Sequence, residues 1–159
     1  MSIKNPETTC DLKSDVVDGI QKLHQANIDS AEGFREAANQ IKHSDLAEKF
    51  RKWSQQRTQQ AKELADIVSC NGAEVDSETS WLADLHRAYT DMKTAFTSND
   101  VHAVLAEAER GEDHIKGAYE DVLKETPGTA ANDVLQRQYA DVKATHDEVR
   151  DLRDAHKDS

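Results

Sequence analysis

The sequence predicts an all-α protein: a bundle of four long helices with one additional, shorter helix. Its 159 residues include only six Gly and two Pro, so little interrupts helix formation. Apolar residues recur every three or four positions through four long stretches, which is the spacing of one helix face. Each stretch also carries a polar residue near the middle of its apolar face. This pattern predicts a polar layer at mid-height in the bundle.

The N-terminal end differs from the rest of the chain. Residues 1–13 show no helical periodicity and include Pro6, so we expect a flexible tail there. All of the periodic stretches fall within residues 14–156. A chain of this length can fill one hydrophobic core, and we therefore predict a single helical-bundle domain over 14–156.

The first two long helices are predicted to form an antiparallel hairpin. The first runs from Ser14, expected as its N-cap, to about Lys42. After a short turn, the second runs from Ser44, again expected as the N-cap, to Cys70. An Asn-Gly pair then ends it, because these residues accept the left-handed conformation at a helix end. The brief connection brings the two helices side by side.

A shorter helix over 80–96 is predicted to follow an irregular segment. The third long helix is expected over 101–124, capped by Ser98 or Asn99, and a Thr-Pro-Gly sequence ends it. The last long helix covers about 130–156. The short helix can return the chain along the outside of the bundle, so that the third long helix runs parallel to the second. This is a four-helix bundle with one crossover.

The polar layer contains opposite charges. Arg57 lies at the centre of the second apolar face and Glu112 at the centre of the third, while Asn27 interrupts the first. Gln60 and Gln138 lie close to the same level. A buried charge without a partner costs several kcal/mol. We therefore predict an Arg57–Glu112 ion pair, supported by Gln60, Asn27 or Gln138.

A metal centre is the alternative interpretation of the same layer. Carboxylates and imidazoles from facing helices hold iron or manganese in many bundles. The candidate ligands here are Glu109, Glu112 and His146. However, the sequence contains no Glu-x-x-His motif, and Arg57 would place positive charge where cations should bind. These features favour a structural layer with no catalytic residues and no cofactor, and iron or manganese remains the alternative.

Composition excludes several classes of partner and predicts the compartment. The net charge is −11, and the basic residues do not gather into a patch, which argues against nucleic acid and membrane surfaces. No apolar run approaches the ~20 residues of a membrane span, and the N-terminus lacks the apolar core of a signal peptide.

Cys10 and Cys70 lack metal-site spacing. We expect them to be inert free thiols in a reducing cytoplasm, because a disulfide is not favoured.

Four short segments resemble a known family. They are GFREAA at residues 33–38, EAERGE at 107–112, RQY at 137–139 and HDEVR at 146–150. In this order they resemble the small bacterial ferritin-like four-helix-bundle proteins of unknown function, which are associated with stress. The resemblance covers about residues 15–154.

The resemblance implies a cytoplasmic ferritin-like bundle, homodimeric, with no established reaction. The larger superfamily binds iron and handles oxygen or peroxide, and only Glu109, Glu112 and His146 can be carried over as possible ligands.

Two functional hypotheses follow. In the first, the protein is a non-enzymatic bundle that acts through its surface, as a dimer or with a protein partner. In the second, it is a carboxylate/His metal protein that handles iron or peroxide.

Overall fold

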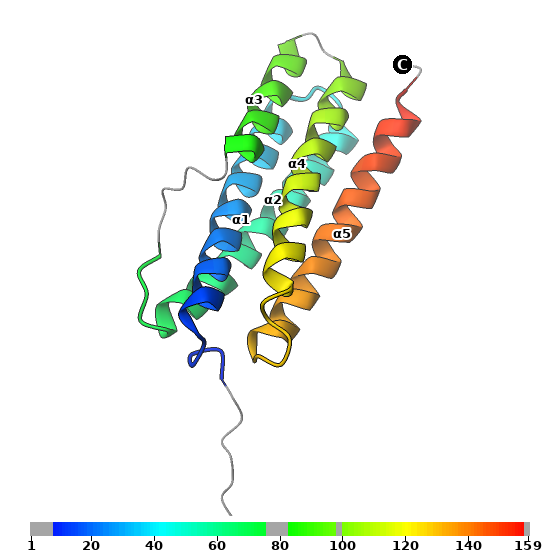
Figure 1. Cartoon of the computed structure of the whole chain (residues 1–159). Helices are drawn as coiled ribbons and strands as arrows, with labels where there is room; N and C mark the ends of the chain where they lie inside the picture. The colour runs from blue at the N-terminus through cyan, green and yellow to red at the C-terminus, as the bar shows by residue number, and fades with distance from the viewer. Residues whose placement is uncertain (1–7, 76–82, 98–99, 158–159) are drawn as a thin grey trace, which may run out of the picture.

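A computed structural model describes residues 8–75, 83–97 and 100–157, and this part of the chain is helical (Figure 1). The five helices are α1 (Ser14–Gln40), α2 (Ser44–Cys70), α3 (Ala83–Thr97), α4 (Val101–Leu123) and α5 (Ala131–Ala155). No strand occurs among the described residues, which confirms the all-α prediction.

The helices pack as two antiparallel hairpins with α3 beside them. In Figure 1, α1 and α2 run in opposite directions, and so do α4 and α5. The chain returns along α3, which packs against α1 and α4, so that α4 runs in the same direction as α2. The described helices thus have the expected order of two long, one short and two long elements.

The first helix boundaries differ from the prediction by one or two residues. The N-cap of α1 is Lys13, because its carbonyl already accepts from Val16 and Val17, and Ser14 is the first helical residue. At its other end α1 stops at Gln40 rather than near residue 42, since the next residue is extended.

Side-chain acceptors cap the N-terminal ends of α2 and α4. His43, not Ser44, caps α2, and its Nδ1 accepts from the backbone N–H of residue 46. Asp100 caps α4 by accepting from the backbone N–H of residue 103 at 3.1 Å. The predicted caps Ser98 and Asn99 lie outside the described residues.

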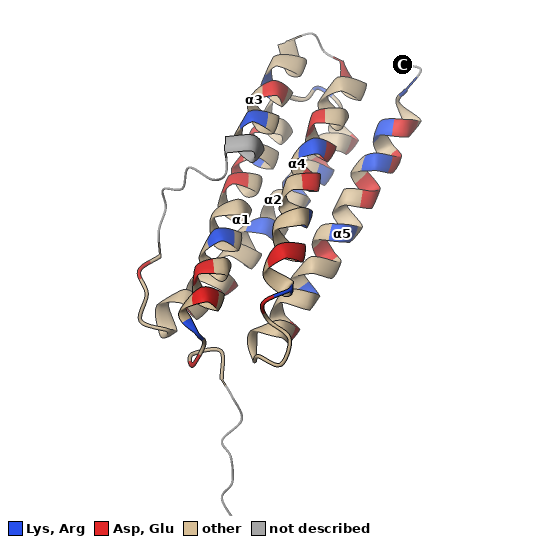
Figure 2. Cartoon of the chain, in the orientation of Figure 1, with Lys and Arg blue, Asp and Glu red and all other residues tan. Residues whose placement is uncertain are grey.

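Charged residues cover the outward faces of the helices and link neighbouring elements. Figure 2 shows acidic and basic segments interleaved along α4 and α5. Two ion pairs join α2 to α5: Lys49 lies 2.6 Å from Glu148, and Arg137 lies 2.7 Å from Glu63. These partly exposed pairs contribute little stability individually.

Aromatic side chains fill the core between α1, α2 and α3. Phe34 lies 5.9 Å from Phe50, 5.6 Å from Trp53 and 5.9 Å from Tyr89, measured between ring centroids. All four rings are buried, which confirms the prediction that Phe50 and Trp53 are core residues. Tyr89 reaches this cluster because α1 presents Gly33 to α3.

Substituting Gly33 by Ala should destabilise the fold. A Cβ at this position would lie 2.2 Å from Cδ1 of Tyr89, so the buried ring would have to move. We expect the Gly33→Ala variant to lose about 1–3 kcal/mol in urea unfolding, as overpacked cores do. Gly117→Ala is the control, since nothing lies within 4 Å of its added Cβ. Equal stability of Gly33→Ala and Gly117→Ala would contradict the packing.

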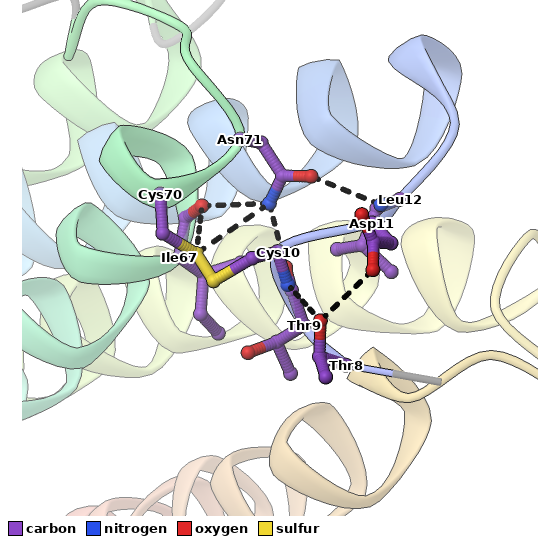
Figure 3. Close-up of a disulfide and its surroundings, with 8 residues drawn as sticks. All are labelled: Thr8, Thr9, Cys10, Asp11, Leu12, Ile67, Cys70 and Asn71. Carbon is purple, nitrogen blue, oxygen red and sulfur yellow. Dashed lines mark hydrogen bonds between the residues drawn. A yellow bond between two sulfur atoms is a disulfide. The ribbon is translucent and has the colours of Figure 1, made fainter. Parts of the chain in front are cut away.

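The segment before α1 is not a free tail over its last residues. Thr8 and Asp11 form a turn, in which the Asp11 N–H donates to the Thr8 carbonyl at 3.2 Å. Cys10 is disulfide-bonded to Cys70, with the two Cα atoms 5.1 Å apart (Figure 3). The prediction of two free cysteines is therefore wrong, and the segment from Thr8 to Leu12 is joined to the end of α2.

The hairpin explains this disulfide. Cys10 precedes α1 by a few residues and Cys70 is the last residue of α2. Because the helices are antiparallel and of equal length, the start of α1 and the end of α2 meet at one end of the bundle. The sequence separation of 60 conceals this proximity, although the predicted hairpin already implied it.

Candidate functional site

The centre of the bundle holds an ion pair between α2 and α4. The guanidinium of Arg57 donates from Nη1 to Oε1 of Glu112 at 2.9 Å and from Nη2 to Oε2 at 2.7 Å. Both side chains are 0% exposed. This bidentate geometry is the strongest form of the Arg–carboxylate interaction. The expected ion pair is therefore present in the structure.

Two further helices contribute to the surroundings of Arg57. Its Nη1 also donates to Oγ of Ser30 on α1 at 2.9 Å, and the hydroxyl of Tyr89 on α3 donates to the same oxygen at 3.1 Å. The guanidinium carbon lies 5.6 Å from the centre of the Phe34 ring, within the range of a cation–π contact. The pair is thus held by α1, α2, α3 and α4.

Electrostatics keep Arg57 charged and the Tyr89 hydroxyl protonated. Burial opposes the charge on Arg57, but the attraction of Glu112 outweighs it, and the pKa of Arg57 is raised. Burial, together with the charge on Glu112, also raises the pKa of Tyr89. The Tyr89 hydroxyl therefore stays protonated and can donate its hydrogen bond across the physiological pH range.

A second hydrogen-bonded chain crosses the bundle beside the ion pair. Asn27 on α1 donates to the hydroxyl of Tyr119 on α4 at 2.8 Å, and Tyr119 donates to Oε1 of Gln138 on α5 at 2.7 Å. The amide of Gln138 then donates to Glu63 on α2 at 2.7 Å. This chain joins all four long helices. Burial raises the pKa of Tyr119, so that its hydroxyl also remains a donor.

The predicted supports of the ion pair are placed elsewhere. Asn27 and Gln138 belong to the Tyr119 chain rather than to the pair. The side-chain amide of Gln60 is buried and has no hydrogen-bond partner among the described residues, while its backbone carbonyl accepts from Gln138 at 3.4 Å. Sequence reasoning missed Ser30 and both tyrosine hydroxyls. A buried tyrosine hydroxyl usually needs a partner, and this was the available signal.

A carboxylate–histidine cluster lies at the surface between α4 and α5. Glu109, Asp113 and His146 each offer one ligand atom, and these atoms lie within 4.8 Å of one another. Nε2 of His146 lies 2.6 Å from Asp113, and Glu109 is paired with Arg153. Residues 109 and 113 share a helix face because they are one turn apart.

Glu112 is not part of this cluster, contrary to the predicted ligand set. It points into the core, where both of its oxygens accept from Arg57. Asp113 takes the expected place of Glu112 beside His146. One residue along a helix turns the side chain by about 100°, which separates an inward carboxylate from one on the surface.

His146 should make stability depend on pH. Burial opposes its protonation, but hydrogen bonds to Asp147 and Asp113 outweigh this and raise its pKa above 6.5. The charged imidazolium therefore stabilises the fold fully below that value, and the contribution is lost as pH rises through the raised pKa. In urea unfolding, we expect Asp113→Asn to lower stability at about pH 5.5 and much less at about pH 8.5. The control is Asp121→Asn on the same helix, and an equal loss at both pH values would contradict the assignment.

These features define a helical-bundle protein whose long helices are joined through a charged core. Residues 15–125, more than half of the chain, match the family described as a domain of unknown function, DUF2383, and the chain belongs to this family. The matched residues include the whole of the Arg57–Glu112 pair and end before α5. Neither the curated proteins nor the solved structures that were compared gave a match. Among the described helices, none combines the length and hydropathy of a membrane span.

Proposed function

We propose that this chain is a ferritin-like bundle without enzymatic activity, a stress-associated cytoplasmic protein that acts through its surface as a homodimer or with a protein partner. The observation that carries the proposal is the Arg57–Glu112 pair. A dinuclear site in such a bundle needs several inward carboxylates at its centre. Here the central carboxylate uses both oxygens on Arg57, and the guanidinium supplies positive charge at the same place.

The central residues therefore do not fit a pair of iron or manganese ions. Glu112 is 0% exposed and could bind a cation only by releasing Arg57, which would leave a second positive charge buried beside the metal. The neighbouring polar groups of Ser30, Tyr89 and Asn27 are neutral. The layer is suited to fixing the register of the helices. The order of two long helices, a short one and two more long helices supports the crossover topology of ferritin-like bundles.

Two measurements on the untagged protein test this proposal. Elemental analysis should find no stoichiometric iron or manganese, also after anaerobic loading with iron. Light scattering coupled to size-exclusion chromatography should give the mass of a dimer, or of a monomer that gains mass with its partner. Bound metal that is lost in Glu112→Gln would overturn the assignment of the central layer.

The surface cluster supports a second candidate function, binding of a single divalent cation. Glu109, Asp113 and His146 supply the oxygen and nitrogen donors that manganese and iron accept, and their ligand atoms lie within 4.8 Å of one another. Binding would require Glu109 to release Arg153. In a calorimetric titration with Mn²⁺, Asp113→Asn should abolish binding and Asp121→Asn should retain it. Equal heats for these two variants would exclude the cluster.

A further inference from the structure

We propose that Cys10 and Cys70 form a reversible dithiol–disulfide couple that fastens the segment Thr8–Leu12 to the end of α2. The disulfide closes the open end of the α1–α2 hairpin, whose other end is closed by the turn over residues 41–43. When the couple is oxidised, the two helices are joined covalently at both ends. When it is reduced, only noncovalent contacts hold the segment.

Both cysteines are placed where small molecules can reach them. Cys10 and Cys70 are exposed, and neither belongs to the hydrophobic core. Within the segment, only Leu12 packs against that core, and it is itself partly exposed. Exposed disulfides are the ones that reagents in solution reduce and re-form. Opening the bond therefore leaves the core packing of the helices in place.

Asn71 keeps the two sulfur atoms close when the bond is open. Its side-chain Nδ2 donates to the carbonyl of Thr9 at 2.6 Å, and its Oδ1 accepts from the backbone N–H of Leu12 at 2.9 Å (Figure 3). These bonds flank Cys10 on both sides. The sulfur of Cys70 also lies 3.3 Å from the carbonyl of Ile67, which can accept the S–H of the open form. The reduced segment is thus pre-positioned to close again.

The couple exchanges with low-molecular-weight thiols in two balanced steps. In closure, one cysteine thiolate attacks the disulfide of an oxidised small thiol, which forms a mixed disulfide and releases one thiol. The second cysteine thiolate attacks the mixed disulfide, which forms the Cys10–Cys70 bond and releases the second thiol. The small disulfide is the oxidant and takes both electrons. Opening is the reverse, with the reduced thiol as reductant.

Glutathione redox buffers test the proposal on the full chain. After equilibration without denaturant, the free thiols are alkylated and counted by mass spectrometry. We expect a single transition between the closed and open forms as the glutathione ratio changes, with unchanged helical circular dichroism. Hydrogen exchange should become faster in residues 8–13 and 71–75 of the reduced protein and stay unchanged in the helix centres.

Two variants that keep both cysteines test whether the hydrogen bonds of Asn71 affect the redox equilibrium. Asn71→Ala should shift the closed–open equilibrium about tenfold towards the open form, because two hydrogen bonds that hold Thr9 and Leu12 are lost. Asn39→Ala, an exposed residue near the opposite end of the hairpin, should leave the equilibrium unchanged. The proposal is overturned if the thiols exchange only in denaturant, if reduction unfolds the helices, or if exchange in residues 8–13 does not change. These readouts involve neither metal content nor molecular mass, so they are independent of the tests above.

Discussion

Arg57→Met is expected to lower the free energy of unfolding by about 3–5 kcal/mol, the usual cost of removing one partner of a buried ion pair. The substitution keeps most of the side-chain volume, so the loss reports charge rather than a cavity. Glu112 would remain at 0% exposure with neither oxygen bonded to a guanidinium. Urea unfolding followed by circular dichroism measures the change from the midpoint and slope.

The double variant Arg57→Met/Glu112→Leu tests whether the loss of stability comes from leaving Glu112 as an unpaired buried charge. Replacing both charges by apolar groups of similar size is often neutral or stabilising, so the double variant should recover most of the loss. Arg110→Met is the control, since Arg110 pairs with Asp91 at the surface and should cost at most about 1 kcal/mol. An unchanged midpoint for Arg57→Met would refute the proposed role of the pair.

The ion pair was predictable because burial of a charge is so costly. Arg57 and Glu112 interrupt apolar faces of two different helices, and each needs a partner of opposite sign at the same level. Helical periodicity alone placed them on inward faces, and the order of the helices placed them at similar heights. The same argument identified the helices themselves, because apolar spacing of three and four residues persists over many turns.

The partners of the pair were less predictable. Ser30 accepts from Arg57, and the Tyr89 hydroxyl reaches Ser30 because α1 and α3 approach closely at Gly33. The sequence gives no rotation or crossing angle for a helix pair. By sequence position alone, an amide side chain such as Gln60 was an equally good candidate to bond the Arg57–Glu112 pair. Which polar neighbour reaches the charge is decided by packing geometry at the scale of one ångström.

The surface cluster shows the same sensitivity to helix rotation. Glu112 and Asp113 are adjacent in the sequence and both carry carboxylates, yet one binds Arg57 and the other contacts His146. Side chains of consecutive helical residues point about 100° apart. To assign the ligands from spacing alone, the rotation of α4 about its own axis must therefore be known to within about 50°. The structure supplies that rotation through the inward position of Glu112.

Removing the disulfide is the other substitution with a large expected effect. Cys10→Ser should lower the free energy of unfolding by about 4 kcal/mol, because the bond closes a loop with a sequence separation of 60 in the unfolded chain. Most of this effect lies in the unfolded state, so circular dichroism of the native helices should not change. The urea dependence should become steeper in the variant, since an unfolded chain without the cross-link exposes more surface.

Reduction of the wild-type protein provides the matched control for this prediction. Wild type in dithiothreitol should unfold at the same urea concentration as Cys10→Ser, and Cys70→Ser should match both. Adding reductant to either variant should then have no effect, because no disulfide remains. Identical midpoints for oxidised and reduced wild type would show that the Cys10–Cys70 bond does not constrain the unfolded chain. Cys10 and Cys70 would then have to lie close together already in the unfolded chain.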